Sequence, residues 1–203
     1  MNRLNWRSIA RSSGAAALLA GLVASSGCGD AVRQGRGSGY LVIESIAATS
    51  GADPSQFTSY LQSDVVTEGS VFEDPGRVTF HLNSKDPSSP VSPTNSVTVS
   101  RYRVVFKRTD GRNTQGVDVP YTFDGAVTAT IPPDGSPVAV SFVLVRAVAK
   151  LEPPLIALAG GGGALYVSTL AEITFYGRDQ AGNEVNVTGT ITINFADWAD
   201  PEK

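Results

Sequence analysis

The sequence predicts an all-β domain, a sandwich or a barrel, behind a short N-terminal export segment. Alternation of apolar and polar residues recurs from Tyr40 to Phe195, as expected for strands that bury one face. Clusters of Gly, Pro, Asn and Asp separate the alternating runs and are typical of tight connections. No segment after Tyr40 shows the apolar period of a long amphipathic helix. We expect roughly eight or nine strands, enough for a two-layer β fold.

The first element is an export signal over residues 1–27. Arg3, Arg7 and Arg11 precede an uncharged stretch over residues 12–27, whose centre is rich in Ala, Leu and Val. A basic region, a short apolar region and small residues before polar sequence are typical of an exported chain. The apolar run is shorter than the roughly 20 residues that span a bilayer comfortably.

Cys28 is the only cysteine and directly follows Ser25, Ser26 and Gly27. This arrangement resembles the lipobox of bacterial lipoprotein signal peptides, in which an aliphatic residue and two small residues precede the lipid-accepting cysteine. Ser26, Gly27 and Cys28 fit that pattern, whereas Ser25 stands where the family usually has an aliphatic residue. The resemblance implies cleavage before Cys28, diacylation of its thiol with palmitate-like chains and acylation of the new amine. Several acyl chains anchor firmly, because each buried methylene contributes about 0.8 kcal/mol.

The residue after Cys28 predicts the membrane. Gly29, and not aspartate, stands there, which in Gram-negative lipoproteins implies the outer membrane, with the domain facing the periplasm or the exterior. A lone cysteine has no partner for the disulfide that oxidising compartments favour, and this supports lipidation. The alternative is ordinary secretion, with cleavage elsewhere and Cys28 incidental.

Residues 28–39 are expected to form a flexible tether between the lipid and the domain. They are rich in Gly and lack apolar periodicity, and a coil of this length has an r.m.s. span of roughly 18 Å.

Removal of residues 1–27 takes away three arginines and no acids, so the net charge of −3 becomes −6. A mildly acidic chain lacks the basic patch that nucleic acids require, so no nucleic-acid partner is expected.

Residues 40–203 are expected to form one β-sandwich domain. Val78, Phe80 and Leu82 alternate inward in one run, and the change of phase between Val99 and Tyr102 predicts a bulge or break near Ser100. The last long apolar run before the Gly cluster is apolar on both faces and predicts a central strand. In the first run, Leu41 and Ile43 are expected on one face and Val42 and Ile46 on the other. The expected strands are residues 40–47, 61–66, 76–82, 101–108, 126–131, 138–149, 170–177 and 184–195.

The final two strands carry a second resemblance. The sequence from Ala171 to Ile193 contains an Asp-x-Ala-Gly-Asn turn between two alternating runs. It resembles the last hairpin of bacterial immunoglobulin-like repeats, and this implies an immunoglobulin-like sandwich. Asp179 can accept hydrogen bonds from amides of the turn, and Gly182 or Asn183 can adopt positive φ at little cost. Such modules serve as spacers, stalks and binding platforms, so the resemblance does not identify a ligand.

Candidate chemical groups are few, and no catalytic, cofactor or metal site is predicted. His81 alternates with core residues, is expected to point outward, and lacks the neighbours of a zinc site. The carboxylates lack the spacing of a calcium loop, and the four glycines from Gly160 lack the helix and Lys-Ser/Thr pair of a phosphate loop. Trp198 and Tyr176 could form a platform for a sugar, although a core-covering role is favoured for Trp198.

The leading hypothesis is a non-enzymatic, lipid-anchored envelope protein that acts as a structural or protein-interaction module. Its partners would be the membrane, through lipid on Cys28, and an envelope protein or glycan. Two alternatives stay open at the level of sequence. One is a module that binds peptidoglycan or a surface glycan, and the other is a hydrolase whose site the motifs do not identify.

Overall fold

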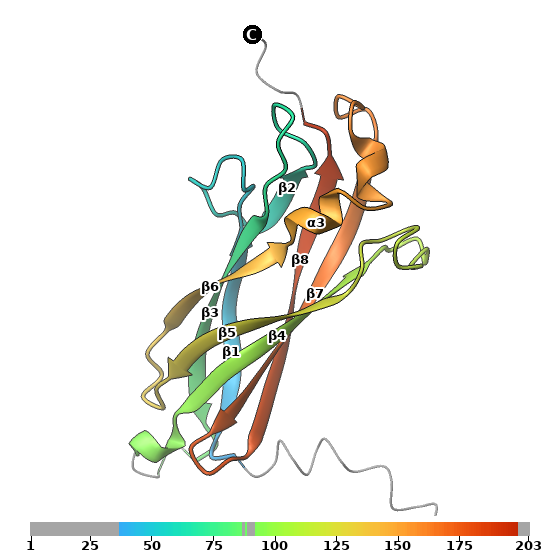
Figure 1. The fold of residues 1–203 in the computed structure, drawn as a ribbon. Helices are drawn as coiled ribbons and strands as arrows, with labels where there is room; N and C mark the ends of the chain where they lie inside the picture. Colours follow the sequence, from blue (N-terminus) through green and yellow to red (C-terminus); the bar gives the residue numbers. More distant parts are fainter. Residues whose placement is uncertain (1–36, 87, 89–91, 199–203) are drawn as a thin grey trace, which may run out of the picture. The chain divides into compact units, whose positions relative to one another are not determined.

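The computed structural model describes residues 37–86, 88 and 92–198, which form eight strands in two sheets (Figure 1). The prediction of an all-β domain is therefore confirmed. Cys28, the export signal and the tether up to Arg36 lie outside the described residues. Within the described residues, no helix is long and apolar enough to cross a membrane.

The smaller sheet has three antiparallel strands in the order β1-β3-β6. They are β1 (Gly39–Ala48), β3 (Asp74–Ser84) and β6 (Val138–Val145). In β3, Val78 and Phe80 are fully buried and Leu82 nearly so, because residues two apart share a face. The inward alternation expected from the sequence is confirmed there.

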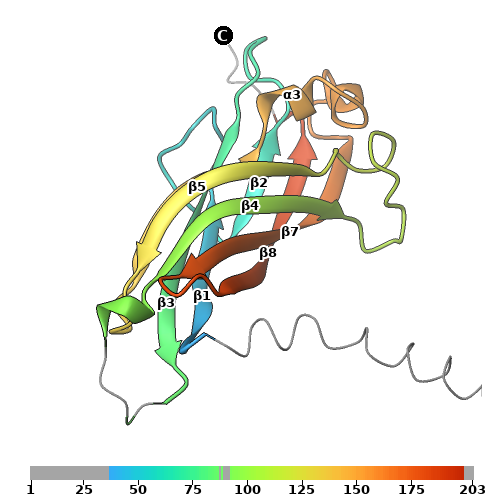
Figure 2. The same cartoon turned by 60° about the horizontal axis from the view of Figure 1, so that its bottom comes forward.

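The larger sheet has five strands in the order β2-β8-β7-β4-β5. All its pairs are antiparallel except β2–β8, which is parallel. Figure 2 shows that β4 and β5 bend strongly as they cross the domain, so this sheet is curled and not flat. Its strands are β2 (Tyr60–Asp64), β4 (Val97–Lys107), β5 (Phe123–Ile131), β7 (Tyr166–Asp179) and β8 (Glu184–Ala196).

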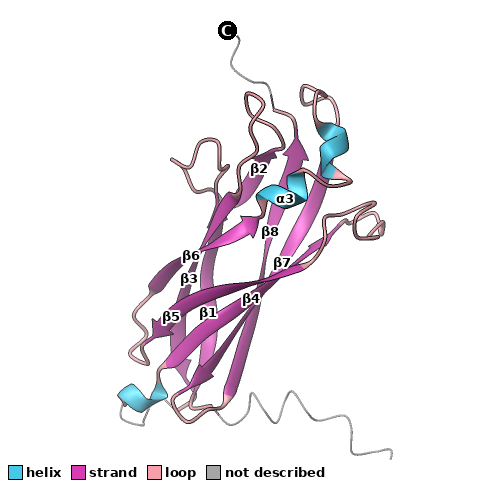
Figure 3. Ribbon diagram, viewed as in Figure 1, coloured by secondary structure: helices cyan, strands magenta, loops and turns pink. Residues whose placement is uncertain are grey.

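In the described connections between strands lie three short helical turns, drawn in cyan in Figure 3. They are η1 (Pro93–Asn95), α3 (Ala147–Lys150) and η2 (Leu155–Leu158). The last two belong to the segment that leads from β6 of the smaller sheet to β7 of the larger one. We call residues 146–165 the crossover segment.

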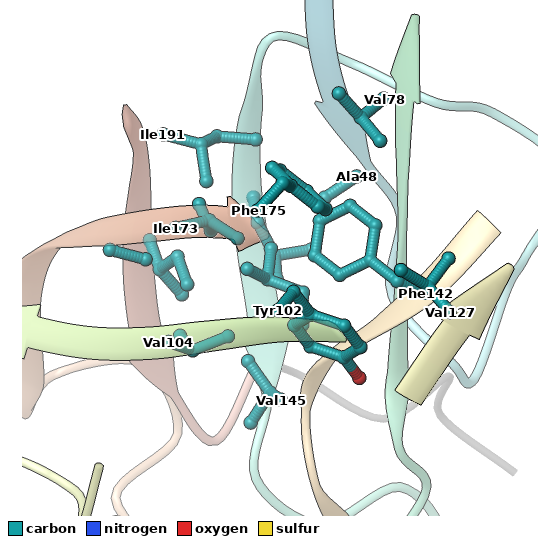
Figure 4. Close-up of a cluster of buried hydrophobic side chains, with 14 of the residues drawn as sticks. Ala48, Val78, Tyr102, Val104, Val127, Phe142, Val145, Ile173, Phe175 and Ile191 are labelled. Atoms are coloured by element: carbon teal, nitrogen blue, oxygen red, sulfur yellow. The ribbon is translucent and has the colours of Figure 1, made fainter. Parts of the chain in front are cut away.

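The core lies between the two sheets and is centred on aromatic side chains (Figure 4). The Phe175 ring meets Phe80 and Phe142 edge to face, with ring centroids 5.0 and 5.3 Å apart. Tyr102 packs against Phe142 and donates its hydroxyl hydrogen to the Val143 carbonyl at 3.0 Å. Each such aromatic pair contributes about 0.5–1.5 kcal/mol beyond the area it buries. These contacts join β3 and β6 of one sheet to β4 and β7 of the other.

Two bulges adjust which side chains reach this core. The register of β4 shifts between Val99 and Arg101, which confirms the break expected near Ser100. A second shift lies in β1 between Ile43 and Ser45. The sequence placed Ile46 on the face opposite Ile43, and this was wrong, because the extra residue at the bulge brings both onto the core.

The prediction of a central strand over residues 138–149 was also wrong. β6 is an edge strand of the smaller sheet and ends at Val145, and α3 follows it. The run is apolar on both faces for two reasons. β6 packs against β5 of the other sheet, and the residues after Val145 bury Ala149 within a helical turn. Periodicity alone does not separate these cases from a strand buried on both sides.

The domain has two distinct ends. The described chain begins at one end, where Gly39 pairs with Ser84 and the β7–β8 hairpin turns (Figure 1). We call this the tether end. At the other end lie α3, η2 and the start of β7, which we call the crossover end. The fourteen residues of β7 run between the two ends and span roughly 45 Å.

Candidate functional site

The most unusual chemical feature of the domain is a buried ionic network at the crossover end. Lys150 of α3 is 1% exposed, and its Nζ lies 2.8 Å from Asp74 Oδ1. Asp74 is fully buried and also accepts hydrogen bonds from Ser63 Oγ at 2.6 Å and the Gly51 amide at 2.9 Å. Lys150 Nζ donates a further bond to the Asp64 carbonyl at 2.8 Å. We call these groups the Asp74 network.

Burial governs the electrostatics of this network. Loss of solvation raises the pKa of the Asp74 carboxyl above its ordinary value, and the Lys150 ammonium and the donors of Ser63 and Gly51 oppose that rise. A buried carboxylate is stable only when its oxygens are hydrogen-bonded and its charge is paired. The polar atoms of Asp74, Lys150 and Ser63 are closed off from solvent, so this network can hold elements together but cannot meet a substrate.

The network joins four segments that are far apart in sequence. It connects α3 to the start of β3, to β2 and to the loop that contains Gly51. Sequence reasoning missed it, because Lys150 lies in an apolar run and Asp74 lies next to a turn. A single lysine between Ala149 and Leu151 was the available signal, since a lysine within a buried run requires a partner.

The predicted turn residues of the β7–β8 hairpin lie together at the tether end. Asp179 Oδ1 accepts hydrogen bonds from the amides of Ala181 and Asn183 at 3.0 and 2.8 Å. Its other oxygen, Oδ2, accepts one from Asn183 Nδ2 at 2.8 Å. Gly182 has a φ of 85°, a conformation that glycine adopts without the penalty of a side chain. These contacts close the turn within five residues.

The remaining sequence candidates do not converge on one site. His81 is half-buried on the face of β3 opposite to Phe80 and Leu82. Asp110 and Asp118 each pair with a nearby arginine, Arg108 and Arg112. Within residues 37–86, 88 and 92–198, no three His, Cys, Asp or Glu side chains gather as metal ligands would.

Trp198 and Tyr176 do not form a shared platform. Tyr176 pairs with Asn186 near the tether end, whereas Trp198 follows β8 at the crossover end. Arg101 stacks over the Tyr176 ring at 4.3 Å from its centroid. The indole of Trp198 is half-buried and lies beside Gly163, where a Cβ would come within 3.7 Å of Trp198 Cε3. Trp198 thus packs beside the glycine run at the crossover end, and the core-covering role expected from the sequence stays a prediction.

The glycine run has a structural role at the same end. Gly160, Gly162 and Gly163 have positive φ, and the chain turns tightly there before β7. The Gly160 amide donates to the Asp197 carboxylate, which ties the loop to the residues that follow β8.

A group of exposed apolar side chains lies on and directly after the crossover segment. Ten large hydrophobic side chains are exposed in the described parts of the chain, and five of these fall between residues 148 and 166. We call these five the crossover patch: Val148 (46% exposed), Leu151 (55%), Ile156 (48%), Leu165 (58%) and Tyr166 (65%). Exposed groups of this kind commonly mark interaction surfaces.

A polar hollow of about 320 Å³ lies beside β2. Its lining includes Asp53, Gln56 and Gln62, with Tyr60 at 49% exposure. Carboxylate and amide groups next to an aromatic ring suit a small polyhydroxylated ligand. The sequence analysis did not identify this hollow, because its residues gather from a loop and an edge strand without a motif.

Comparison with known proteins adds little. No protein family matches the chain, and the curated proteins contain no significant match. The chain is similar to a solved protein described as "X-ray structure of Northeast Structural Genomics Consortium target SoR45", at 11% sequence identity and a TM-score of 0.37. That match covers 80% of this chain and 92% of the other. Values this low do not assign a fold or an activity.

Proposed function

We propose that the protein is a lipid-anchored cell-envelope module that binds a partner and does not catalyse a reaction. Lipid on Cys28 would fix it to the outer membrane, and residues 28–39 would give the domain reach. The observation that carries the proposal is the polarity of the domain. Its chain enters at one end, and the crossover patch lies at the other, roughly 45 Å away along β7.

This polarity suits a tethered binding module for a geometric reason. A tether with an r.m.s. span of roughly 18 Å keeps the tether end close to the membrane surface. The crossover end is free to swing farther out, where loops can contact other molecules. The Asp74 network supports the same role, because it holds the crossover segment in one conformation and so reduces the ordering cost of binding.

The proposal extends to the fold family. We propose that the domain is immunoglobulin-like, supported by its two packed sheets and by the Asp179 turn between β7 and β8. The parallel β2–β8 pair and the strong bend of β4 and β5 are departures from a regular sandwich of two antiparallel sheets.

Anchoring is tested by replacing Cys28 with Ala and separating membranes from soluble material. The wild-type protein should sediment with outer membranes and incorporate labelled palmitate, whereas the C28A variant should do neither. A Ser26→Ala variant is the matched control, because alanine is also small and should leave processing intact. Membrane retention of C28A together with unlabelled wild type would refute the anchor.

A second candidate function is binding of a glycan at the hollow beside β2. The specific observation in its favour is the exposed Tyr60 ring near the carboxylate and amides of Asp53, Gln56 and Gln62. Purified peptidoglycan fragments should bind the wild type and lose affinity in Tyr60→Ala, with Tyr40→Ala as a control at another exposed tyrosine, at the tether end. Equal binding by both variants would exclude this hollow.

A further inference from the structure

Buried neighbours hold the exposed side chains of α3 and η2 in place. In α3, Ala149 and Lys150 are buried while Val148 is exposed, and Leu151, which directly follows the helix, is exposed as well. η2, which packs against α3, repeats the arrangement, because Leu155 and Leu158 are buried and Ile156 is exposed. The buried members and the Lys150 ion pair hold the exposed members outward. A surface ordered in advance loses little entropy when it is covered.

The rest of the given sequence has no segment suited to cover this patch. Residues 199–203 read Ala-Asp-Pro-Glu-Lys and have no large apolar side chain. The apolar run before Cys28 is removed by the cleavage that the proposed lipid anchor requires. With neither segment available, the occupant that fits the proposed function is another molecule.

The charges beside the patch favour a particular occupant. Arg146 precedes Val148 and Glu152 follows Leu151, so charges of opposite sign flank the apolar pair. The Arg146 guanidinium is positioned at the surface by stacking on the Phe123 ring, 4.6 Å from its centroid. When two such segments meet antiparallel about a twofold axis, each Arg146 faces Glu152 of the other copy. Val148 and Leu151 of one copy then contact the same residues of the other copy, and no like charges face each other.

We propose that the crossover patch binds a second copy of this chain through an isologous contact centred on α3. The contact is inferred from the exposed apolar pair and its flanking charges, whereas the gathering of copies at the membrane rests on the proposed lipid anchor. Copies anchored through the same residue in one leaflet are confined to a thin layer at the membrane, which raises the local concentration of matching surfaces. A chain with a net charge of −6 after residue 27 has no attraction to an anionic bilayer, so lipid is the poorer occupant.

Cysteine crosslinking in native membranes tests the contact on the full-length protein. Val148→Cys places a thiol beside the expected axis, and Tyr40→Cys, exposed to 59%, is the control at the tether end. A short bismaleimide should give a homodimer, recognised by its doubled mass, about tenfold more efficiently with Val148→Cys than with Tyr40→Cys. Equal yields, or an adduct only with another protein or with lipid, would overturn the proposal.

Charge exchange separates a specific contact from a general loss of structure. Arg146→Glu in the Val148→Cys background should lower the homodimer yield about tenfold, because each new glutamate faces Glu152 of the other copy. Adding Glu152→Arg should restore the yield, because the pair is then reversed and again complementary. No loss with the first change, or no recovery with the second, would refute the antiparallel arrangement.

The same experiment keeps this proposal apart from the anchor. A lipidated Cys28 cannot react, so the wild type should give no adduct. A wild-type homodimer through Cys28 would show that the anchor is absent, while the contrast between the Val148→Cys and Tyr40→Cys yields would still decide the contact.

Discussion

The two ends of the domain are held by different kinds of interaction. At the tether end, Asp179 closes the β7–β8 turn with hydrogen bonds to residues no more than four positions away. At the crossover end, Lys150 reaches Asp74, 76 positions away, inside the protein. The first arrangement can form as soon as the hairpin forms. The second requires both sheets to be in place, so the crossover end should depend on the whole fold.

The largest expected effect comes from opening the Asp74 network. Asp74→Ala leaves the Lys150 ammonium buried without its partner, and the free energy of unfolding should fall by about 3–5 kcal/mol. Urea denaturation measures this change. The double variant Asp74→Leu with Lys150→Met should lose less than the single variant, because no uncompensated charge then remains. A loss below about 1 kcal/mol would mean that the buried pair contributes little.

A smaller effect is expected at the other end. Asp179→Ala removes three hydrogen bonds of the turn and should cost about 1–2 kcal/mol, comparable to the loss of a helix cap. Trp198 is the single tryptophan after residue 27 and reports on the crossover end. Its fluorescence in the folded state should be unchanged by Asp179→Ala and altered by Lys150→Met. A change in both would show that the two ends are coupled.

Glycines with positive φ offer a matched test at the two ends. Gly182 and Gly160 have φ of 85° and 78°, and a Cβ at either position would meet no atom within 4 Å. Alanine at each position should therefore cost about 1 kcal/mol from backbone strain alone. Thermal denaturation of both variants measures this. A much larger cost at Gly160 would show that the crossover loop is held more tightly than the hairpin.

The smallest effect concerns surface charge. The hydrogen bond from Arg108 holds the pKa of the Asp110 carboxyl below its ordinary value of 3.8. The stabilisation that this pair gives is present above the ordinary pKa and is lost as the pH falls through the lowered one. An NMR titration of the carboxyl carbon should show the low midpoint, and Arg108→Gln should move it upward. An unchanged midpoint in that variant would assign the shift to another group.

The sequence predicted more of the structure at the tether end than at the crossover end. The turn at Asp179 was predicted with its residues, because its hydrogen bonds are local and follow from residue type and spacing. The inward set of β3 and the bulge of β4 were predicted because alternation records which face is buried. The Asp74 network and the hollow beside Tyr60 were missed, because their residues come from segments that only the fold brings together.

The sequence by itself determined the all-β class, most strands and the closing hairpin of this domain. Tertiary structure decided that β6 lies at an edge, that a bulge turns Ile46 onto the core, and that β2 joins β8 in parallel. It also decided that Lys150 would be buried against Asp74 while its neighbours Val148 and Leu151 face outward. The physical reason is range: turns and alternation depend on neighbouring residues, whereas strand order and charge pairing depend on which distant surfaces pack together.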